Sequence, residues 1–241
     1  MSVFSAEAWV KVWTYRGTFL LGLRNTAATA VFAILLALML GIVFGLCATG
    51  KSRLLRGVAR AYVEVIQNTP VLLQICFLYY ALAYSGVKIT VVTIGFISLG
   101  LYHGAYVAEV VRAGIQSIPM GQFDAARSQG FDYVDTMRHI ILPQTIKIIL
   151  PPMVNQMVAL IKNTSCLYII GGADLIATTY NFVTGASTGG AYGPAYLVGG
   201  ALFFCVCYPL SMMAGRWEQR LKERDKVKNE PTDDGAKEAA A

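Results

Sequence analysis

The stretch NTAATAVFAILLALMLGIVFGLCATG, residues 25–50, contains no Asp, Glu, Lys or Arg. A helix rises 1.5 Å per residue, so about 20 mostly apolar residues cross a hydrocarbon layer about 30 Å thick. A strand of a membrane barrel would instead alternate apolar and polar residues over about ten positions. Residues 25–50 are apolar on every face, so they predict a membrane-spanning helix.

The composition of the whole chain also favours a membrane protein. Its 241 residues are 56% hydrophobic and 14% charged, whereas soluble domains average about 45–50% apolar and about 25% charged residues. This apolar content excludes disorder for most of the chain. The five cysteines lie mostly inside apolar runs, which favours packing over disulfides. No metal site and no catalytic centre are predicted.

Further charge-free runs divide the chain into spans. They cover residues 65–87, 89–108, 148–161 and 175–215. The last run consists of two parts. Residues 177–194 are rich in Gly, Thr, Ser and Asn, which is typical of a loop, whereas residues 195–215 are continuously apolar. We expect an all-α polytopic membrane protein with about five transmembrane helices. Their expected positions are near 27–48, 62–83, 89–109, 145–162 and 195–215.

Lysine and arginine residues mark one side of the membrane. They concentrate after the first, third and fifth spans, whereas residues 163–194 contain none. The positive-inside rule places the charged segments in the cytoplasm and the N-terminus outside. We expect residues 1–18 to be extracytoplasmic without a signal peptide, and residues 221–241 to form a disordered cytoplasmic tail. The net charge of +6 then reflects topology and indicates no nucleic-acid partner.

One motif matches a nucleotide-binding pattern in its letters but lacks the structural context that the pattern needs. Residues 45–52, GLCATGKS, match the phosphate-loop pattern G-x-x-x-x-G-K-[ST]. That loop requires a preceding strand, so that backbone N–H groups converge on phosphate. Here a helix-length membrane run precedes it, so we expect Gly50 to end a helix and no nucleotide to bind.

The longest charged interruption lies between the third and fourth spans, at residues 119–143. Pro119 and Gly121 break the preceding helix, Asp124 is expected in the first turn of a short helix, and Gly130 is expected to close it in a left-handed conformation. An amphipathic stripe follows at Phe131, Val134, Met137 and Ile141. The pattern predicts two short helices across the cytoplasmic face, although a re-entrant interfacial helix would also fit.

Residues 124–143 resemble the EAA loop, E-A-A-x3-G-x9-I-x-L-P, of bacterial type I ABC importer permeases, with Asp124 in place of the first Glu. Four other segments resemble the polar amino acid (HisMQ-type) permeases of that family. They are residues 67–74 (QNTPVLLQ), 106–115 (YVAEVVRAGI), 150–156 (LPPMVNQ) and 162–165 (KNTS). The resemblance runs from about residue 19 to residue 220, which it implies is a permease domain.

The resemblance implies a subunit of the bacterial inner membrane that transports polar amino acids and is no enzyme itself. Such permeases pair with a second copy or a sister permease, receive substrate from an extracytoplasmic binding protein, and dock ATPase subunits that carry ATP and magnesium. No cofactor is expected on this chain. The implied ATPase-coupling residues are Gln122, Asp124, Ala125, Ala126, Arg127 and Gly130.

Polar residues at membrane depth are the candidates for contacting the substrate, because such groups are costly there unless functional or paired. They are Asn68, Thr69, Gln74, Glu109, Asn163, Thr164 and Ser165. Glu109 could instead pair with Arg112, one helical turn away. Some members of the family carry Asp where this chain has Asn163, and the missing charge favours acidic or amide amino acids (glutamate, aspartate or glutamine) over arginine or lysine.

The sequence also fits two other functions. One is a secondary transporter or channel that works without an ATPase, although five spans without a detectable repeat are less natural for an inverted-repeat carrier. The other is a structural membrane subunit without a substrate path, which the polar residues at membrane depth argue against.

Overall fold

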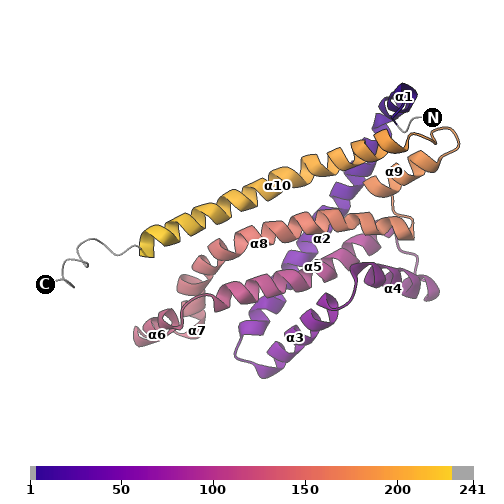
Figure 1. Cartoon of the computed structure of the whole chain (residues 1–241). Helices are drawn as coiled ribbons and strands as arrows, with labels where there is room; N and C mark the ends of the chain where they lie inside the picture. The colour runs from indigo at the N-terminus through magenta and orange to yellow at the C-terminus, as the bar shows by residue number, and fades with distance from the viewer. Residues whose placement is uncertain (1–3, 230–241) are drawn as a thin grey trace.

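The computed structural model describes residues 4–229, and this part of the chain is helical, without strands. Figure 1 shows the arrangement of the helices. The helices are α1 (Ala6–Thr14), α2 (Arg16–Thr49), α3 (Arg53–Gln67), α4 (Val71–Tyr84), α5 (Val91–Gln116), α6 (Met120–Ser128), α7 (Tyr133–Asp135), the π-helix η1 (Thr136–Ile141), α8 (Leu142–Asn163), the 3-10 helix η2 (Thr164–Ile170), α9 (Leu175–Thr184) and α10 (Tyr192–Asn229). The predicted all-α membrane fold is confirmed.

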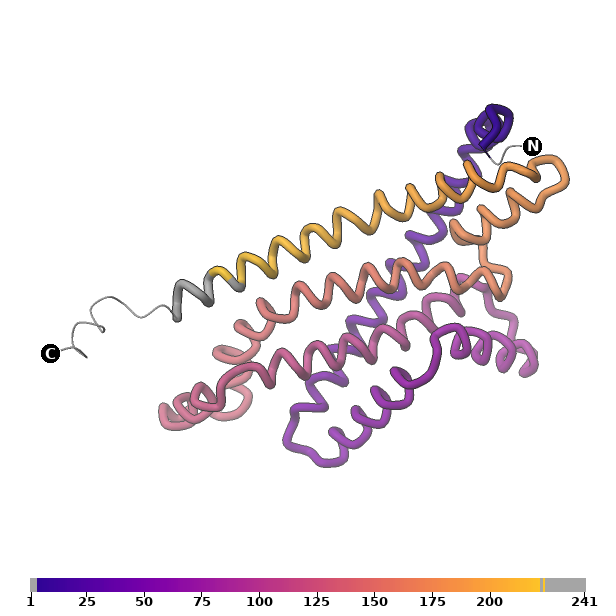
Figure 2. Tube along the Cα trace, viewed as in Figure 1, coloured from indigo at the N-terminus to yellow at the C-terminus, as the bar shows by residue number. Residues whose placement is uncertain are grey.

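Three long helices, α5, α8 and α10, run side by side, and α2 crosses them at an angle (Figure 1). We call one end of this bundle the α6 end, because α6 and α7 lie there. The opposite end, with α1 and α9, is the α9 end. Figure 2 shows that α1 and the far end of the coloured part of α10 lie at opposite ends. The bundle therefore has two distinct ends, each of which can contact partners or solvent.

The α2–α5 contact is close because small residues line it. Ala33, Ala37, Gly41 and Gly45 recur every four residues along α2 and are all buried. A Cβ atom added at Gly41 would lie 2.3 Å from a methyl carbon of Val107 on α5. Small residues at this spacing let helix backbones approach closely, as in membrane helix pairs.

Within residues 4–229, three helices are long and apolar enough to cross a membrane, or five if each of two bent pairs counts as one span. The expected spans near 27–48, 89–109, 145–162 and 195–215 lie in α2, α5, α8 and α10. The span expected near 62–83 is not continuous, because α3 and α4 meet at 100°. Pro70 explains the break: it cannot donate a backbone hydrogen bond and disfavours helix at Thr69.

Two further expectations need correction. Residues 177–194 are not all loop, because α9 begins at Leu175 and buries Phe182 and Val183 against α1 and α10. Tertiary packing there outweighs a polar composition. The tail expected to be disordered from residue 221 is helical through Asn229, in a segment rich in the good helix formers Glu, Lys and Arg. Residues 230–241 lie outside the described part of the chain.

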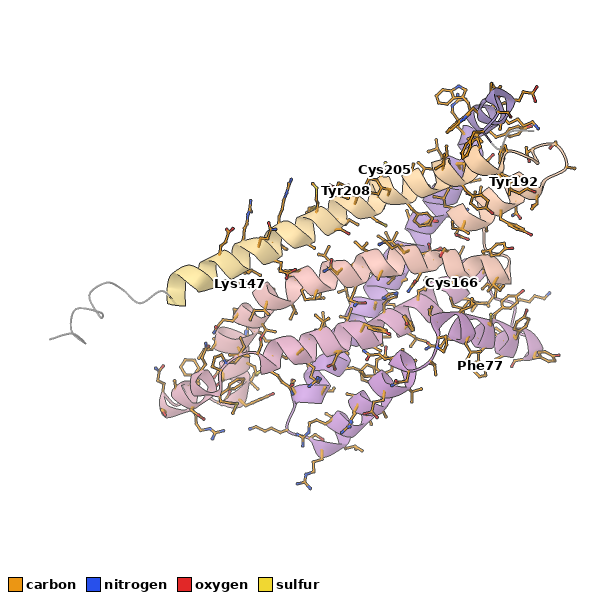
Figure 3. The ribbon with its side chains drawn as sticks, viewed as in Figure 1. Phe77, Lys147, Cys166, Tyr192, Cys205 and Tyr208 are labelled. Carbon is orange, nitrogen blue, oxygen red and sulfur yellow. The ribbon has the colours of Figure 1, made fainter. Side chains whose placement is uncertain are left out.

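Within residues 4–229, no other element covers one face of α10. Figure 3 shows Cys205 and Tyr208 along this helix, and Tyr208 is 49% exposed. Phe204 and Met213 are exposed as well. A large apolar face of this kind suits contact with lipid or with another membrane subunit.

Candidate functional site

The first group of predicted contact residues lies at the break between α3 and α4. The Gln74 amide donates to the Thr69 hydroxyl at 2.6 Å and to the Ile66 carbonyl at 3.0 Å. The Asn68 amide donates to the Glu64 carbonyl at 2.7 Å. The Gln74 amide of α4 thus bonds to the last turn of α3 across the break, while the Glu64 carbonyl also accepts the backbone N–H of Asn68. The break is therefore stabilised by the side chains of Asn68, Thr69 and Gln74.

Two side chains of α3 fix this broken segment against α5. The Tyr62 hydroxyl donates to the Leu101 carbonyl at 2.6 Å, and the Gln67 amide donates to the Ala105 carbonyl at 3.3 Å. The approach is close at Gly104, where an added Cβ would lie 2.7 Å from the Tyr62 hydroxyl oxygen. The break is thus attached to the middle of the bundle.

The second predicted group, residues 163–165, lies where α8 passes into η2. Asn163 Nδ2 lies 3.1 Å from His103 Nε2 of α5. Thr164 is fully buried and donates to the Ile161 carbonyl at 2.8 Å, while Ser165 is half-buried. Of the three, Asn163 is the residue joined to another span by a side-chain hydrogen bond that the structure shows.

His103 is absent from the predicted contact residues. It is 2% exposed, and its Nδ1 atom has no hydrogen-bond partner within the described residues by distance and angle. From the sequence, a lone histidine in the charge-free run 89–108 can either line the transport path or pack at a helix interface, and its burial shows that it is packed. Because His103 and Asn163 are 60 residues apart in the chain, the sequence alone does not show that they are in contact.

Glu109 forms an ion pair with Arg112 on the same face of α5. Arg112 donates from Nε to one Glu109 carboxylate oxygen at 2.8 Å and from a terminal nitrogen to the other oxygen. Arg112 also donates to Gln116 at 2.5 Å. The pairing that the sequence left as one of two alternatives is present.

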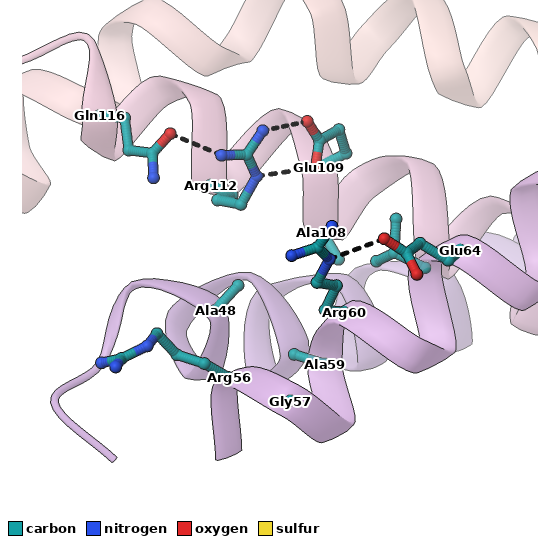
Figure 4. Close-up of a pocket in the computed structure, with 11 residues that line it drawn as sticks. Ala48, Arg56, Gly57, Ala59, Arg60, Glu64, Ala108, Glu109, Arg112 and Gln116 are labelled. Atoms are coloured by element: carbon teal, nitrogen blue, oxygen red, sulfur yellow. Dashed lines mark hydrogen bonds and ion pairs between the residues drawn. The ribbon is translucent and has the colours of Figure 1, made fainter. Parts of the chain in front are cut away.

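This ion pair borders a cavity of about 610 Å³ between α3 and α5, toward the α6 end. Figure 4 shows Arg60 and Glu64 on the α3 side, joined at 2.7 Å, and Glu109, Arg112 and Gln116 on the α5 side. The remaining lining residues are mostly small. They are Ala48, Arg56, Gly57, Ala59, Val63 and Ala108.

The predicted coupling residues lie on α6 and just after it. The Gln122 amide and the Gln144 amide of α8 donate to each other's oxygens, at 3.2 and 2.6 Å. Ala126 is buried, at 2% exposure, whereas Asp124, Ala125 and Arg127 are exposed. Gln122 and Ala126 thus attach α6 to the bundle, and its other face is open to a partner.

Gly130 ends this segment as expected, with φ +84° in the left-handed region. The Phe131 N–H donates to the Ala126 carbonyl at 3.1 Å, which closes the end of α6. Asp124 is not in the first turn, because α6 begins earlier, at Met120, directly after Pro119. Proline sets a backbone angle that suits a helix start, so the expected start was four residues late.

The segment after Gly130 is only partly the amphipathic helix that the sequence predicts. Met137 and Ile141 are buried, whereas Phe131 and Val134 are exposed. The helix here has π geometry and leads directly into Pro143, which has no N–H to donate to the carbonyl four residues earlier.

The segment that matches the phosphate-loop pattern does not have the structure of a phosphate loop. Residues 45–49 are the last residues of helix α2, whereas the loop requires a strand before it.

Comparisons with known proteins agree with this architecture. The family described as "Binding-protein-dependent transport system inner membrane component" matches residues 33–223. A probable glutamine ABC transporter permease protein, GlnM of Bacillus subtilis strain 168, is 35% identical over 202 residues, covering 84% of this chain and 92% of the relative. The arginine transport system permease protein ArtQ of the same organism is 32% identical over 205 residues, covering 85% and 92%.

A solved structure is also similar. The crystal structure of an amino acid ABC transporter with histidines superimposes with a TM-score of 0.80 at 31% identity, covering 88% of this chain and 98% of the matched chain.

Proposed function

Because the chain belongs to the family of inner-membrane components of binding-protein-dependent transport systems, we propose that it is the permease of an ATP-driven importer for polar amino acids. A relative named as a probable glutamine permease supports the expected preference for amide or acidic side chains. The arginine permease among the relatives matches somewhat less well, at 32% identity against 35%. The neutral Asn163 also favours glutamine and glutamate over basic amino acids.

The observation that carries this proposal is the two-sided character of α6. Its inner side is held by the Gln122–Gln144 pair and buried Ala126, and its outer side presents Asp124, Ala125 and Arg127. A small residue such as Ala125 lets the backbone of a partner approach closely. We propose that an ATPase subunit, which carries ATP and magnesium, docks on this outer side.

The path by which ATP would act follows from the connections of α6. Only residues 117–119 separate α6 from α5, and on its other side α7 and η1 connect α6 to α8. A push on α6 therefore reaches both helices that hold His103 and Asn163. The coupling requires that ATP and the loaded binding protein favour one arrangement of α5 and α8, and that ADP favour the other.

The distribution of charge supports an orientation with the α6 end in the cytoplasm. Lys51 lies over the ring of Tyr133 in α7, Arg127 lies in α6 and Arg138 in η1, whereas residues 163–194, toward the α9 end, contain no Lys or Arg. The N-terminus would then lie outside, where the extracytoplasmic binding protein delivers substrate. The uncovered face of α10 suits a second copy or a sister permease.

Co-purification tests the docking surface. The tagged transporter is purified from its own cells, and the amount of ATPase that accompanies the permease is measured for Ala125→Leu. The control is Ala6→Leu, an exposed alanine on α1 at the other end of the bundle. We expect Ala125→Leu alone to lose the ATPase. Full retention would contradict docking on α6 and would favour the alternative of a transporter or channel that works without an ATPase.

A further inference from the structure

The cavity between α3 and α5 is bordered by two ion pairs, one from each helix. Arg60–Glu64 belongs to α3 and Glu109–Arg112 to α5, and both contribute lining residues (Figure 4). We propose that this cavity is a binding site for an α-amino acid at the cytoplasmic end of the permease. The ligand's carboxylate would meet the guanidinium groups, and its ammonium group would meet a glutamate. The proposal rests on the proposed function, because it makes the cavity the inner stage of the transport path.

Two charges lie where a spanning helix reaches the cytoplasmic end of the bundle, on the way of a substrate that leaves the membrane. Glu109 and Arg112 follow the charge-free run 89–108 within α5, one of the helices long and apolar enough to span a membrane. Charged residues in such helices are costly unless they face a water-filled cavity, and they often mark the path of a polar substrate. Their side chains are 41% and 35% exposed. The cavity leaves both side chains accessible to water and to a polar ligand.

The balance of charge selects the ligand. Three guanidinium groups line the cavity, from Arg56, Arg60 and Arg112, against only two carboxylates. Arg56 donates to the backbone carbonyls of Gly50 and Lys51, at 2.6 and 3.0 Å, which carry no charge. One positive charge is therefore uncompensated, and a carboxylate would balance it. Guanidinium groups bind carboxylates through paired hydrogen bonds.

The existing ion pairs do not block such a ligand. The Arg60 and Glu64 side chains are 80% and 57% exposed, and exposed pairs contribute little stability, so they can change partners at small cost. Small residues, including Gly57 and Ala59, leave space between the two helices. The volume of about 610 Å³ lies within the usual range of small-molecule sites, roughly 300–1,000 Å³.

Cysteine protection tests the site directly. The five native cysteines are replaced, and Gly57→Cys is introduced, because Gly57 lines the cavity and an added Cβ there meets nothing within 4 Å. Gly17→Cys at the exposed start of α2 is the matched control, since an added Cβ there is equally unobstructed but lies outside the lining. The complete transporter in nanodiscs reacts with a charged maleimide in the presence of L-glutamine, L-glutamate, glutarate or sodium chloride.

We expect both amino acids to slow labelling at Gly57→Cys and to leave labelling at Gly17→Cys unchanged, with glutarate and sodium chloride having a much weaker effect. Adding Arg112→Gln should raise the half-protecting concentration about tenfold, as expected for the loss of one charge-assisted hydrogen bond. If Arg112→Gln fails to assemble, Arg60→Gln on the exposed pair provides the same comparison.

Three results would overturn the site: no labelling at Gly57→Cys, labelling that no amino acid slows, or equal slowing by sodium chloride. ATP-driven uptake is measured on the same preparations. Uptake without protection would refute this site and leave the proposed function intact. Protection together with uptake that needs no ATP would refute the proposed function and leave the site intact.

Discussion

Asn163 Nδ2 lies 3.1 Å from His103 Nε2, so one hydrogen bond joins the end of α8 to the middle of α5. Asn163→Ala should leave His103, which is only 2% exposed, without this partner. We expect a loss of about 1–3 kcal/mol of stability, and an altered preference among glutamine, glutamate and arginine. Competition uptake assays and thermal denaturation measure the two effects. Unchanged transport and preference would refute a role for Asn163 in substrate recognition.

Asn163→Asp is the complementary variant, because it keeps the shape of the side chain and adds a negative charge. If Asn163 faces the substrate, uptake of arginine relative to glutamine should rise. A uniform loss of uptake for all amino acids would indicate that the residue supports the helices and does not recognise substrate.

Gly130 adopts a backbone conformation that other residues rarely take, with φ +84°. Gly130→Ala should cost about 1–2 kcal/mol and loosen the end of α6, which lowers ATP hydrolysis stimulated by the loaded binding protein. Gly121→Ala is the control, because Gly121 lies in α6 without positive φ and has space for a Cβ. Equal activity of the two variants would show that the closure of α6 does not matter for coupling.

Adjacent alanines on α6 should respond differently to enlargement. Ala126 is buried at 2% exposure and Ala125 is exposed. Ala126→Leu should overfill the contact with the bundle and cost about 1–3 kcal/mol, lowering the melting temperature of the purified permease. Ala125→Leu should leave the melting temperature unchanged while abolishing ATPase docking. The reverse pattern would mean that α6 presents its other side to the partner.

The reciprocal amide pair between Gln122 and Gln144 should couple α6 to α8 energetically. A double-mutant cycle with alanine at each position should give an interaction energy of about 0.5–2 kcal/mol in thermal or denaturant unfolding. ATP-driven transport should fall in both single variants. Strictly additive effects on stability would show that the pair is not a mechanical link.

Several features were predictable from local sequence because their causes are local. The charge-free runs predict spanning helices from apolar content alone, and Gly130 closes α6 because glycine tolerates the left-handed region. The pairing of Glu109 with Arg112 follows from their spacing of one turn. The resemblance to polar amino acid permeases, carried by several short motifs in order, agrees with the family match.

Other features depend on contacts between distant segments. The break at residues 68–70 lies inside an apolar run, and proline alone does not predict a bend of 100°. The helix α9 forms because Phe182 and Val183 are buried against other helices, despite a loop-like composition. The contact of His103 with Asn163 and the cavity between α3 and α5 appear only once the helices are packed.

Uptake by the reconstituted transporter tests the central proposal most directly. Proteoliposomes containing the permease and its ATPase, with ATP inside the compartment that the ATPase faces, receive labelled L-glutamine together with the binding protein. We predict uptake that requires both ATP and the binding protein and that Ala125→Leu abolishes. Uptake by this chain alone, driven by a proton or sodium gradient and indifferent to ATP, would contradict the proposed function.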